Sequence, residues 1–223
     1  MEIAQQCPLC LSHATNFYHS DPARDYYQCG HCRLVFVSER FLLPPDREKS
    51  IYDLHQNSLD DAGYRCFLDR LFSPMHAALQ TGSYGLDFGS GPGPTLSVMF
   101  SEAGHDIAIY DYFYANNPLV FDDEYDFITA TEVIEHLYTP GQELERLWGL
   151  LKPGGLLGIM TKRVRNRDAF ASWHYKNDPT HVCFFSRSTF DWLAARWDAE
   201  ISYPAGDVVI FRKHGADGYG RNT

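Results

Sequence analysis

The chain has 223 residues, 44% of them hydrophobic, which suits one ordinary domain plus a small module whose core needs no disulfides. Lysine and arginine number 19 against 29 aspartate and glutamate, and the resulting formal net charge of −10 argues against nucleic acid as a partner. The sequence has no long apolar run and begins without a secretory signal pattern, so we expect no membrane span and a reducing, cytoplasmic location.

Two cysteine pairs lie near the start of the chain. Cys7-Pro8-Leu9-Cys10 and Cys29-Gly30-His31-Cys32 both have the C-x2-C spacing. Each pair can present two thiolates to one metal ion, and two pairs close a tetrahedral, structural Zn²⁺ site. Gly30 is expected to give the second turn its backbone freedom. Residues 1–40 are therefore predicted to form a small zinc-ribbon-like module that is held by Cys7, Cys10, Cys29 and Cys32. Disulfides are the alternative, and a reducing compartment disfavours them.

Residues 41–84 read as a helical linker, with an early break at Pro44-Pro45. Tyr64 and Phe67 follow at helical spacing, and Tyr52, His55 and Asn57 precede them. These side chains are candidates for a lid over a ligand. The alternative is an amphipathic helix that packs its aromatic face on a sheet.

Residues 85–213 alternate apolar runs with helical patterns, which is typical of βαβ units and a doubly wound, mostly parallel sheet. The predicted strands are Tyr84–Phe88, Asp106–Tyr110, Asp126–Ala130 and Leu156–Thr161, followed by an antiparallel closing pair at Glu200–Tyr203 and Asp207–Arg212. Helices are predicted at Pro94–Ala103, at Pro140–Leu151 and from an N-cap at Ser188 to Arg196. The fold class is thus α/β with an antiparallel last strand. The polar tail, residues 214–223, is expected to be flexible.

A glycine-rich loop follows the strand Tyr84–Phe88 and opens the next helix. Gly89, Gly91 and Gly93 let the backbone approach a ligand, and the helix N-terminus offers unpaired N–H groups to it. The following strand ends at Asp111, where a carboxylate can accept both hydroxyl groups of a ribose.

Two other nucleotide-binding patterns fit this loop less well. The dinucleotide fingerprint G-x-G-x-x-G requires a third glycine where Pro94 stands, and no G-K-[ST] follows for a P-loop. A nicotinamide-dependent oxidoreductase is therefore disfavoured. Asp87, just before the glycines, can pair with an ammonium group, which an amino-acid cofactor carries and a dinucleotide does not.

The stretch Leu86-Asp87-Phe88-Gly89-Ser90-Gly91-Pro92-Gly93 resembles motif I of class I S-adenosylmethionine-dependent methyltransferases, which have a Rossmann-like fold. Asp111, the segment from Tyr125 to His136 and the turn Lys152-Pro153-Gly154-Gly155 resemble later motifs of that family in the same order. The cysteine pairs resemble the N-terminal zinc-binding modules of some bacterial members. One departure is that residues 112–125 are too few for the helix and third strand that the family usually has there.

The resemblance implies S-adenosylmethionine as the cofactor and assigns contacts to it. The methionine part would lie against Gly89, Ser90, Gly91 and Gly93, with Asp87 under its ammonium group. Asp111 would hold the ribose, and Tyr112 and Phe113 would pack on the adenine. Thr131 and Glu132 would face the methionyl end.

Residues 163–185 follow the last parallel strand, where this family often builds its acceptor site, and His181 lies in that stretch. His181 is the candidate catalytic base or acceptor contact; a structural histidine that bonds loop backbone is the alternative. We expect transfer of a methyl group to a small-molecule acceptor that the sequence does not identify. The alternatives are a methyltransferase for RNA or protein that reads its substrate through the zinc module, and a non-catalytic cofactor-binding protein. A basic stretch at Lys162, Arg163, Arg165 and Arg167 is the feature that a nucleic-acid substrate would use.

Overall fold

The computed structural model describes residues 5–54 and 59–215. Of the sequence predictions, His55, Asn57 and most of the tail fall outside these residues. The strands are β1 (Thr15–Ser20), β2 (Asp25–Cys29), β3 (Val35–Val37), β4 (Tyr84–Phe88), β5 (Asp106–Tyr110), β6 (Tyr125–Thr131), β7 (Leu151–Met160), β8 (Cys183–Phe184), β9 (Glu200–Ala205) and β10 (Val208–Arg212). The α-helices are α1 (Pro45–Tyr52), α2 (Ala62–Ala78), α3 (Thr95–Glu102), α4 (Pro140–Gly149), α5 (Arg167–Ala171) and α6 (Arg187–Trp197). Short 3-10 turns are η1 (Glu39–Phe41), η2 (Pro118–Asp122), η3 (Ile134–His136) and η4 (His174–Asn177).

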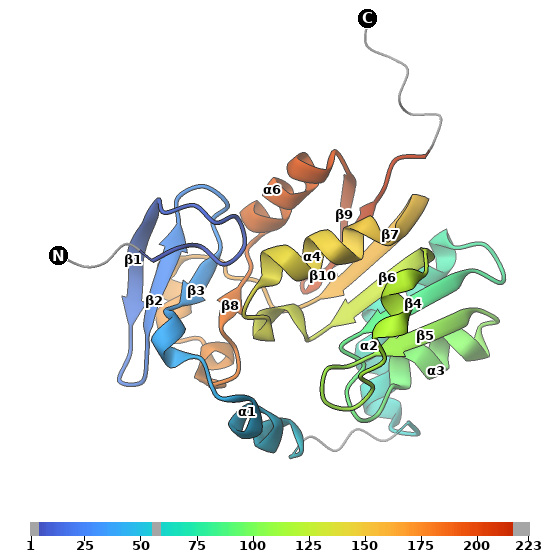
Figure 1. Ribbon diagram of the computed structural model, residues 1–223, viewed down its shortest axis with the longest axis horizontal. Coiled ribbons are helices and arrows are strands. Elements are labelled where there is room, and N and C mark those ends of the chain that lie inside the picture. Colours follow the sequence, from blue (N-terminus) through green and yellow to red (C-terminus); the bar gives the residue numbers. More distant parts are fainter. Residues whose placement is uncertain (1–4, 55–58, 216–223) are drawn as a thin grey trace, which may run out of the picture.

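A mixed sheet of six strands forms the body of the molecule, in the order β5-β4-β6-β7-β10-β9. The strands β5, β4, β6 and β7 are parallel, and β10 and β9 are antiparallel to their neighbours. Helices α2 and α3 pack on one face of the sheet, while α4 and α6 lie on the other (Figure 1). The predicted α/β class, with its antiparallel last strand, is confirmed.

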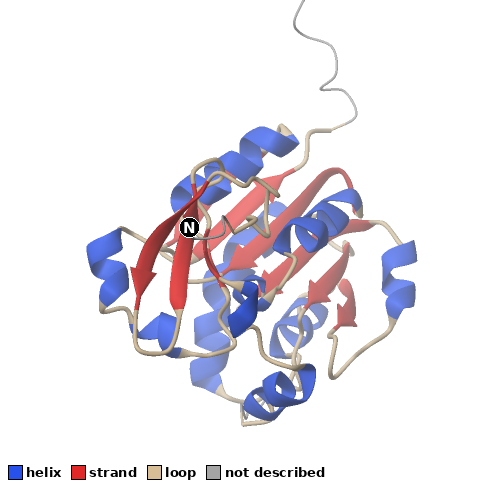
Figure 2. Ribbon diagram, turned by 60° about the vertical axis from the view of Figure 1, so that its left-hand side comes forward, coloured by secondary structure: helices blue, strands red, loops and turns tan. Residues whose placement is uncertain are grey.

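A smaller antiparallel sheet carries the N-terminal cysteines, in the order β1-β2-β3-β8 (Figure 2). Its fourth strand, β8, is distant in the sequence from the other three, because Val35 and Phe36 pair with Phe184 and Cys183. The backbone of Val37 also donates to the carbonyl of Val182 at 3.0 Å. The N-terminal sheet is therefore joined by main-chain hydrogen bonds to the segment that precedes α6.

Several element boundaries differ from the sequence prediction. The N-cap of α6 is Ser186 and not Ser188, because the Ser186 and Thr189 side chains bond each other's backbone N–H groups reciprocally, as in a capping box. Strand β7 begins at Leu151, so the predicted turn of residues 152–155 is an irregular stretch inside the strand. Gly30 does not take a left-handed conformation; Leu11 and Arg33, one after each cysteine pair, do so instead.

The stretch between β5 and β6 contains η2 but no strand in the described structure, as its shortness predicted. Strand β5 is consequently an edge strand of the six-stranded sheet. None of the described helices is both long and apolar enough to cross a bilayer.

Candidate functional site

A cavity of about 720 Å³ opens at the carboxyl ends of β4, β5 and β6. The predicted site residues that line it are Gly89, Ser90, Gly91, Asp111, Tyr112, Phe113, Thr131, Glu132 and His181. Nine residues from four separate parts of the chain are thereby brought to one space, which is large enough for a small ligand. Asp87 and Gly93 are not among its lining residues.

The glycine loop is anchored to the end of β5. Gly91 donates its backbone N–H to Asp111 Oδ2 at 2.9 Å, and Gly89 donates to the carbonyl of Tyr110 at 2.7 Å. Gly89 and Gly91 both have positive φ angles, of 75° and 64°. A side chain at Gly89 would meet Val133 at 2.3 Å, whereas one at Gly91 would stand in open space. The loop thus exposes a bare stretch of main chain to the cavity beside a carboxylate.

Asp111 is held in a fixed orientation by three backbone N–H groups. Its Oδ2 accepts from Gly91, and its Oδ1 accepts from Phe113 at 2.9 Å and Tyr114 at 3.0 Å. A carboxylate has about four lone-pair positions, and these bonds occupy both of those on Oδ1, so Oδ2 keeps one acceptor position for a hydroxyl group of a ligand.

Asp87 lies beneath the loop and not on the cavity wall. Ser97 and Thr129 each donate a hydroxyl to one of its carboxylate oxygens at 2.8 Å. Burial raises the pKa of this carboxyl group, and the two hydroxyl donors oppose that rise. These contacts join β4 to α3 and β6, so Asp87 stabilises the base of the glycine loop.

Two carboxyl groups follow the end of β6. Glu132 has a φ of 50°, a left-handed conformation that costs a non-glycine residue about 1–3 kcal/mol and is typical of functional sites. Tyr175 donates its hydroxyl to Glu135 and also lies 3.3 Å from Glu132 Oε2. Burial raises the pKa of Glu132 to about 7 and that of Glu135 to about 8, and for Glu135 the nearby charge of Glu132 adds to the rise.

His181 bonds loop backbone, as expected for a structural histidine, and it also lines the cavity. Its Nδ1 bonds the carbonyl of Tyr175 at 2.7 Å, which places the proton on Nδ1 and the lone pair on Nε2. Burial lowers the pKa of His181, which favours the neutral imidazole. The ring of His136 lies 4.7 Å from that of His181, centroid to centroid, and lines the same cavity.

The loop that carries His181 is held by an arginine of the N-terminal sheet. Arg24 is 7% exposed, and its guanidinium donates to four main-chain carbonyls of the loop: those of Lys176, Asp178, Pro179 and His181. Nearby, Lys176 forms a buried ion pair with Asp21 at 2.8 Å. Burial opposes the charged form of Asp21, but the Lys176 ammonium and the N–H groups of Ala23 and Arg24 hold its pKa well below the usual range.

We expect Arg24→Met to lower the free energy of unfolding by about 3 kcal/mol, because buried carbonyls that lose their donor cost about 1–3 kcal/mol each. For a chain of this size that loss corresponds to a fall of about 6–12 °C in melting temperature, which thermal denaturation followed by circular dichroism would measure. Arg40→Met is the matched control, since Arg40 forms an exposed ion pair with Asp25 and its removal should cost less than about 1 kcal/mol. Equal shifts for the two variants would show that Arg24 does not hold the loop.

Aromatic side chains also line the cavity, and they were predicted only in part. Tyr52, Tyr64 and Phe67 of α1 and α2 line the cavity, and Tyr64 and Phe67 also pack against the buried core, so both the lid and the packing alternatives stay open. Tyr52 and Tyr138 also donate their hydroxyls to Glu48, at 2.7 and 3.1 Å. Glu135, Tyr138 and Arg24 were not singled out in the sequence analysis. The E-x-x-E-H spacing from Glu132 to His136 is the signal that could have identified Glu135.

The four cysteines of the N-terminal sheet converge on one point. Their sulfur atoms all lie within 4.8 Å of one another, with 3.5 Å between Cys7 and Cys32 and between Cys10 and Cys29. A tetrahedral ion with bonds of about 2.3 Å to sulfur would set its ligands about 3.8 Å apart, so the cluster has the size of a metal site. The backbone N–H of His31 points to the Cys29 sulfur at 3.3 Å, which stabilises a thiolate.

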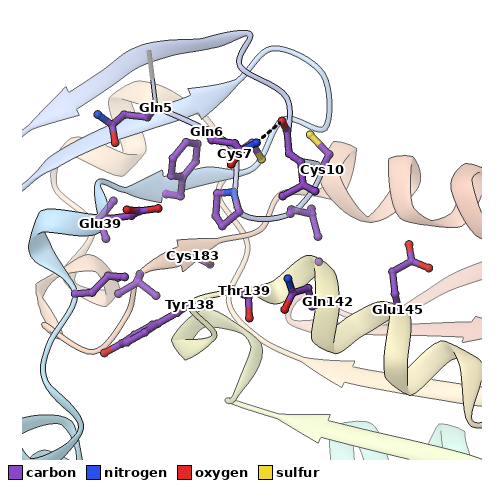
Figure 3. Close-up of a pocket in the computed structure, with 18 of the residues that line it drawn as sticks. Gln5, Gln6, Cys7, Cys10, Glu39, Tyr138, Thr139, Gln142, Glu145 and Cys183 are labelled. Carbon is purple, nitrogen blue, oxygen red and sulfur yellow. Dashed lines mark hydrogen bonds between the residues drawn. The ribbon is translucent and has the colours of Figure 1, made fainter. Parts of the chain in front are cut away.

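A second cavity, of about 790 Å³, lies between the first cysteine pair and α4 (Figure 3). Figure 3 shows Cys7 and Cys10 above Thr139 and Gln142 at the start of that helix. The helix approaches the cysteine turn closely, because a side chain at Gly141 would meet the carbonyl oxygen of Leu9 at 2.2 Å. This cavity contains neither the glycine loop nor Asp111, and it is not the place where the predicted cofactor contacts gather.

A family model described as a methyltransferase domain matches residues 61–202 of the chain. Among solved structures, the chain is similar to the 1,6-didemethyltoxoflavin-N1-methyltransferase of Burkholderia thailandensis, which was solved with 1,6-didemethyltoxoflavin and S-adenosylhomocysteine bound. The identity is 17%, the match covers 89% of this chain and 99% of that one, and the TM-score is 0.50. The N-methyltransferase NodS of Bradyrhizobium japonicum is similar at 14% identity over 70% of this chain and 99% of that one, with a TM-score of 0.44. No curated protein matches the sequence.

Proposed function

The chain belongs to the methyltransferase domain family and is an S-adenosylmethionine-dependent enzyme, and from that premise we propose that it methylates a small molecule bound beside His181. The observation that carries the proposal is the single cavity that joins the glycine loop, Asp111 and His181. The Burkholderia enzyme, which is named for the methylation of 1,6-didemethyltoxoflavin, supports the choice of a small-molecule acceptor.

The residues of the cavity fit the cofactor. The open space at Gly91 admits a ligand against the main chain, and Asp111 Oδ2 offers its remaining acceptor position to a ribose hydroxyl. Tyr112 and Phe113 continue from Asp111 along the wall and offer their rings to the adenine. Thr131 and Glu132 lie at the end of β6, where the methionyl part would be held. When bound, S-adenosylmethionine supplies an activated methyl group.

The acceptor end of the cavity would be formed by His136, Asp178 and His181, and the ring of Tyr52 from α1 lies 5.3 Å from that of His136, centroid to centroid. Methyl transfer depends chiefly on alignment and on exclusion of water. His181 has its lone pair on Nε2 and is placed to hold an acceptor hydroxyl or amine. The rigid loop around it, fixed by Arg24, supplies the alignment.

We assign a structural role to the cysteine cluster, with Zn²⁺ as its metal. Four thiolates leave no open coordination position for a substrate, and the cluster supports the sheet that holds the His181 loop. In this division, residues 1–40 form the zinc module, residues 41–84 the helical linker and lid, and residues 85–213 the cofactor-binding domain. A role for the module in reading RNA gains no support from the basic stretch, since Arg163 is bonded to the carbonyls of Ala205 and Gly206.

Isothermal titration calorimetry with S-adenosylmethionine and S-adenosylhomocysteine tests the function directly. We expect one molecule of either to bind per chain with a Kd in the micromolar range, about −8 kcal/mol. A panel of small hydroxylated and amine-bearing heterocycles, assayed for the formation of S-adenosylhomocysteine, would then identify the acceptor class. Absence of binding by both ligands to folded, zinc-containing protein would refute the proposal.

A further inference from the structure

Three side chains, two of which line the acceptor end of the cavity, form a second cluster of possible metal-ligand atoms, apart from the cysteines. Glu135, His136 and His181 each offer one ligand atom, and these atoms lie within 4.8 Å of one another. Glu135 and His136 belong to η3, and His181 comes from the loop held by Arg24. Both histidines line the cavity, so a group bound between them would be open to a ligand.

Glu135 carries an uncompensated buried oxygen. The residue is completely buried, and while Tyr175 donates to its Oε1, its Oε2 has no hydrogen-bond partner among the described residues. Glu132 Oε1, at the same end of β6, is likewise buried without a partner. Buried polar atoms in this condition are costly and rare, and a cation beside them would supply the missing interaction.

The two histidines have the hydrogen bonds that metal ligands need. The Nδ1 atom of His181 bonds the carbonyl of Tyr175 at 2.7 Å, and that of His136 bonds the carbonyl of Thr180 at 3.2 Å. A carbonyl accepts, so each Nδ1 bears the proton and each Nε2 bears the lone pair. Metal-ligating histidines are almost always oriented by such a second bond, which fixes the tautomer.

We propose that Glu135, His136 and His181 bind a divalent transition-metal ion whose open positions take an oxygen of the methyl acceptor. Two imidazoles and one carboxylate are typical of Mn²⁺, Fe²⁺ and Zn²⁺ sites and not of Ca²⁺ or Mg²⁺ sites. This inference rests on the proposed function and narrows it to a hydroxylated acceptor. It also assigns to His181 the role of a ligand in place of a base.

The metal would lower the pKa of the acceptor hydroxyl, as it does for bound water. The hydroxyl proton then goes to solvent water, and a lone pair of the oxygen forms the new O–C bond to the methyl group. The C–S bond breaks as that bond forms, and its electron pair stays on sulfur. No oxidant or reductant is required.

Mn²⁺ is the probe that separates this site from the cysteine cluster, because Mn²⁺ favours oxygen and nitrogen ligands and the thiolates would be occupied by zinc. Titration of the full zinc-loaded chain, followed by the electron paramagnetic resonance of free Mn²⁺, should give one bound ion per chain. Glu135→Gln and His136→Ala should each weaken that binding at least about tenfold, which is the effect that even outer-shell changes reach. His174→Ala is the control, since His174 is an exposed histidine of the same loop outside the cluster.

Mn²⁺ binding that is undetectable at millimolar concentration, or equal in the wild type and both variants, would overturn the metal site. Should Glu135→Gln fail to fold, His136→Ala carries the comparison. Calorimetry with S-adenosylhomocysteine on the same samples keeps the two proposals apart. Normal cofactor binding without Mn²⁺ binding would refute the metal site and leave the proposed function intact, whereas loss of cofactor binding in the wild type would refute the function itself.

Discussion

Asp111→Asn is expected to weaken the binding of S-adenosylhomocysteine by about 100-fold, measured by isothermal titration calorimetry. Hydrogen bonds to a charged group contribute about 1.5–3 kcal/mol, and each 1.4 kcal/mol is a factor of ten. The neutral amide forms a weaker hydrogen bond to the ribose hydroxyl than the carboxylate does. Its NH₂ group also conflicts with the backbone N–H groups around it. Its NH₂ group must face either the N–H of Gly91 or those of Phe113 and Tyr114, and in both orientations two donors meet.

The control for this variant is Asp106→Asn. Asp106 is an exposed residue at the opposite end of the same strand, so it experiences the same change of charge without contact to the cavity. We expect its affinity to stay within about twofold of the wild type, because surface substitutions rarely exceed 0.5 kcal/mol. If Asp111→Asn also binds like the wild type, the carboxylate does not hold the cofactor and the assignment of the cavity fails.

Cys29→Ser is expected to abolish stoichiometric zinc and to unfold the N-terminal sheet. Structural zinc sites contribute about 10–16 kcal/mol of apparent binding free energy, which becomes folding free energy because the unfolded chain has no preformed site. Metal analysis by mass spectrometry should find about one zinc per chain in the wild type and less than about 0.1 in the variant. Hydrogen exchange should show lost protection in β1, β2 and β3, and also in β8, which has β3 as its neighbour in the sheet.

Cys66→Ser provides the matched comparison, since Cys66 is an exposed cysteine of α2 outside the cluster. It should retain zinc and protection at the wild-type level. Zinc in Cys29→Ser at the wild-type amount would show that the four sulfurs are not the metal site. Faster exchange confined to β1, β2 and β3 would show that the segment with His181 and β8 stays folded without the other strands of the N-terminal sheet.

Much of the fold could be predicted because its signals are local. The strands β4 and β5 were placed to the residue, since short apolar runs there end at glycine or aspartate and parallel neighbours follow from a βαβ unit. The proximity of the glycine loop to Asp111 followed from the same order of elements, whereas the hydrogen bond between Gly91 and Asp111 was not predicted. Glu132 and His181 were singled out by the family resemblance, one at the end of β6 and the other in the segment after the last parallel strand, and both line the cavity.

The unpredicted features depend on long-range contacts or on burial. Strand β8 has two residues and pairs with residues about 150 positions earlier, which no period in the sequence reports. From the sequence, Arg24 is expected to be a surface residue of a polar turn. In the structure it is buried, because four carbonyls of a distant loop accept hydrogen bonds from it. The helix start at Ser186 was misplaced because Ser188 stands two residues later, and the partner at the capping position is Thr189 where a glutamate or glutamine is usual.

Because β8 is synthesised long after β3, the N-terminal sheet cannot be completed until most of the chain has been made. A ribosome adds about 5–20 residues per second, so the roughly 150 residues between β3 and β8 take about 7–30 seconds to emerge. During that interval the nascent hairpin of β1 and β2 and the short β3 have an open edge with unpaired main-chain groups, which is a hazard for aggregation. Early capture of an ion by the cysteines, all of which have been synthesised by residue 32, would hold these strands together until their last partner is made.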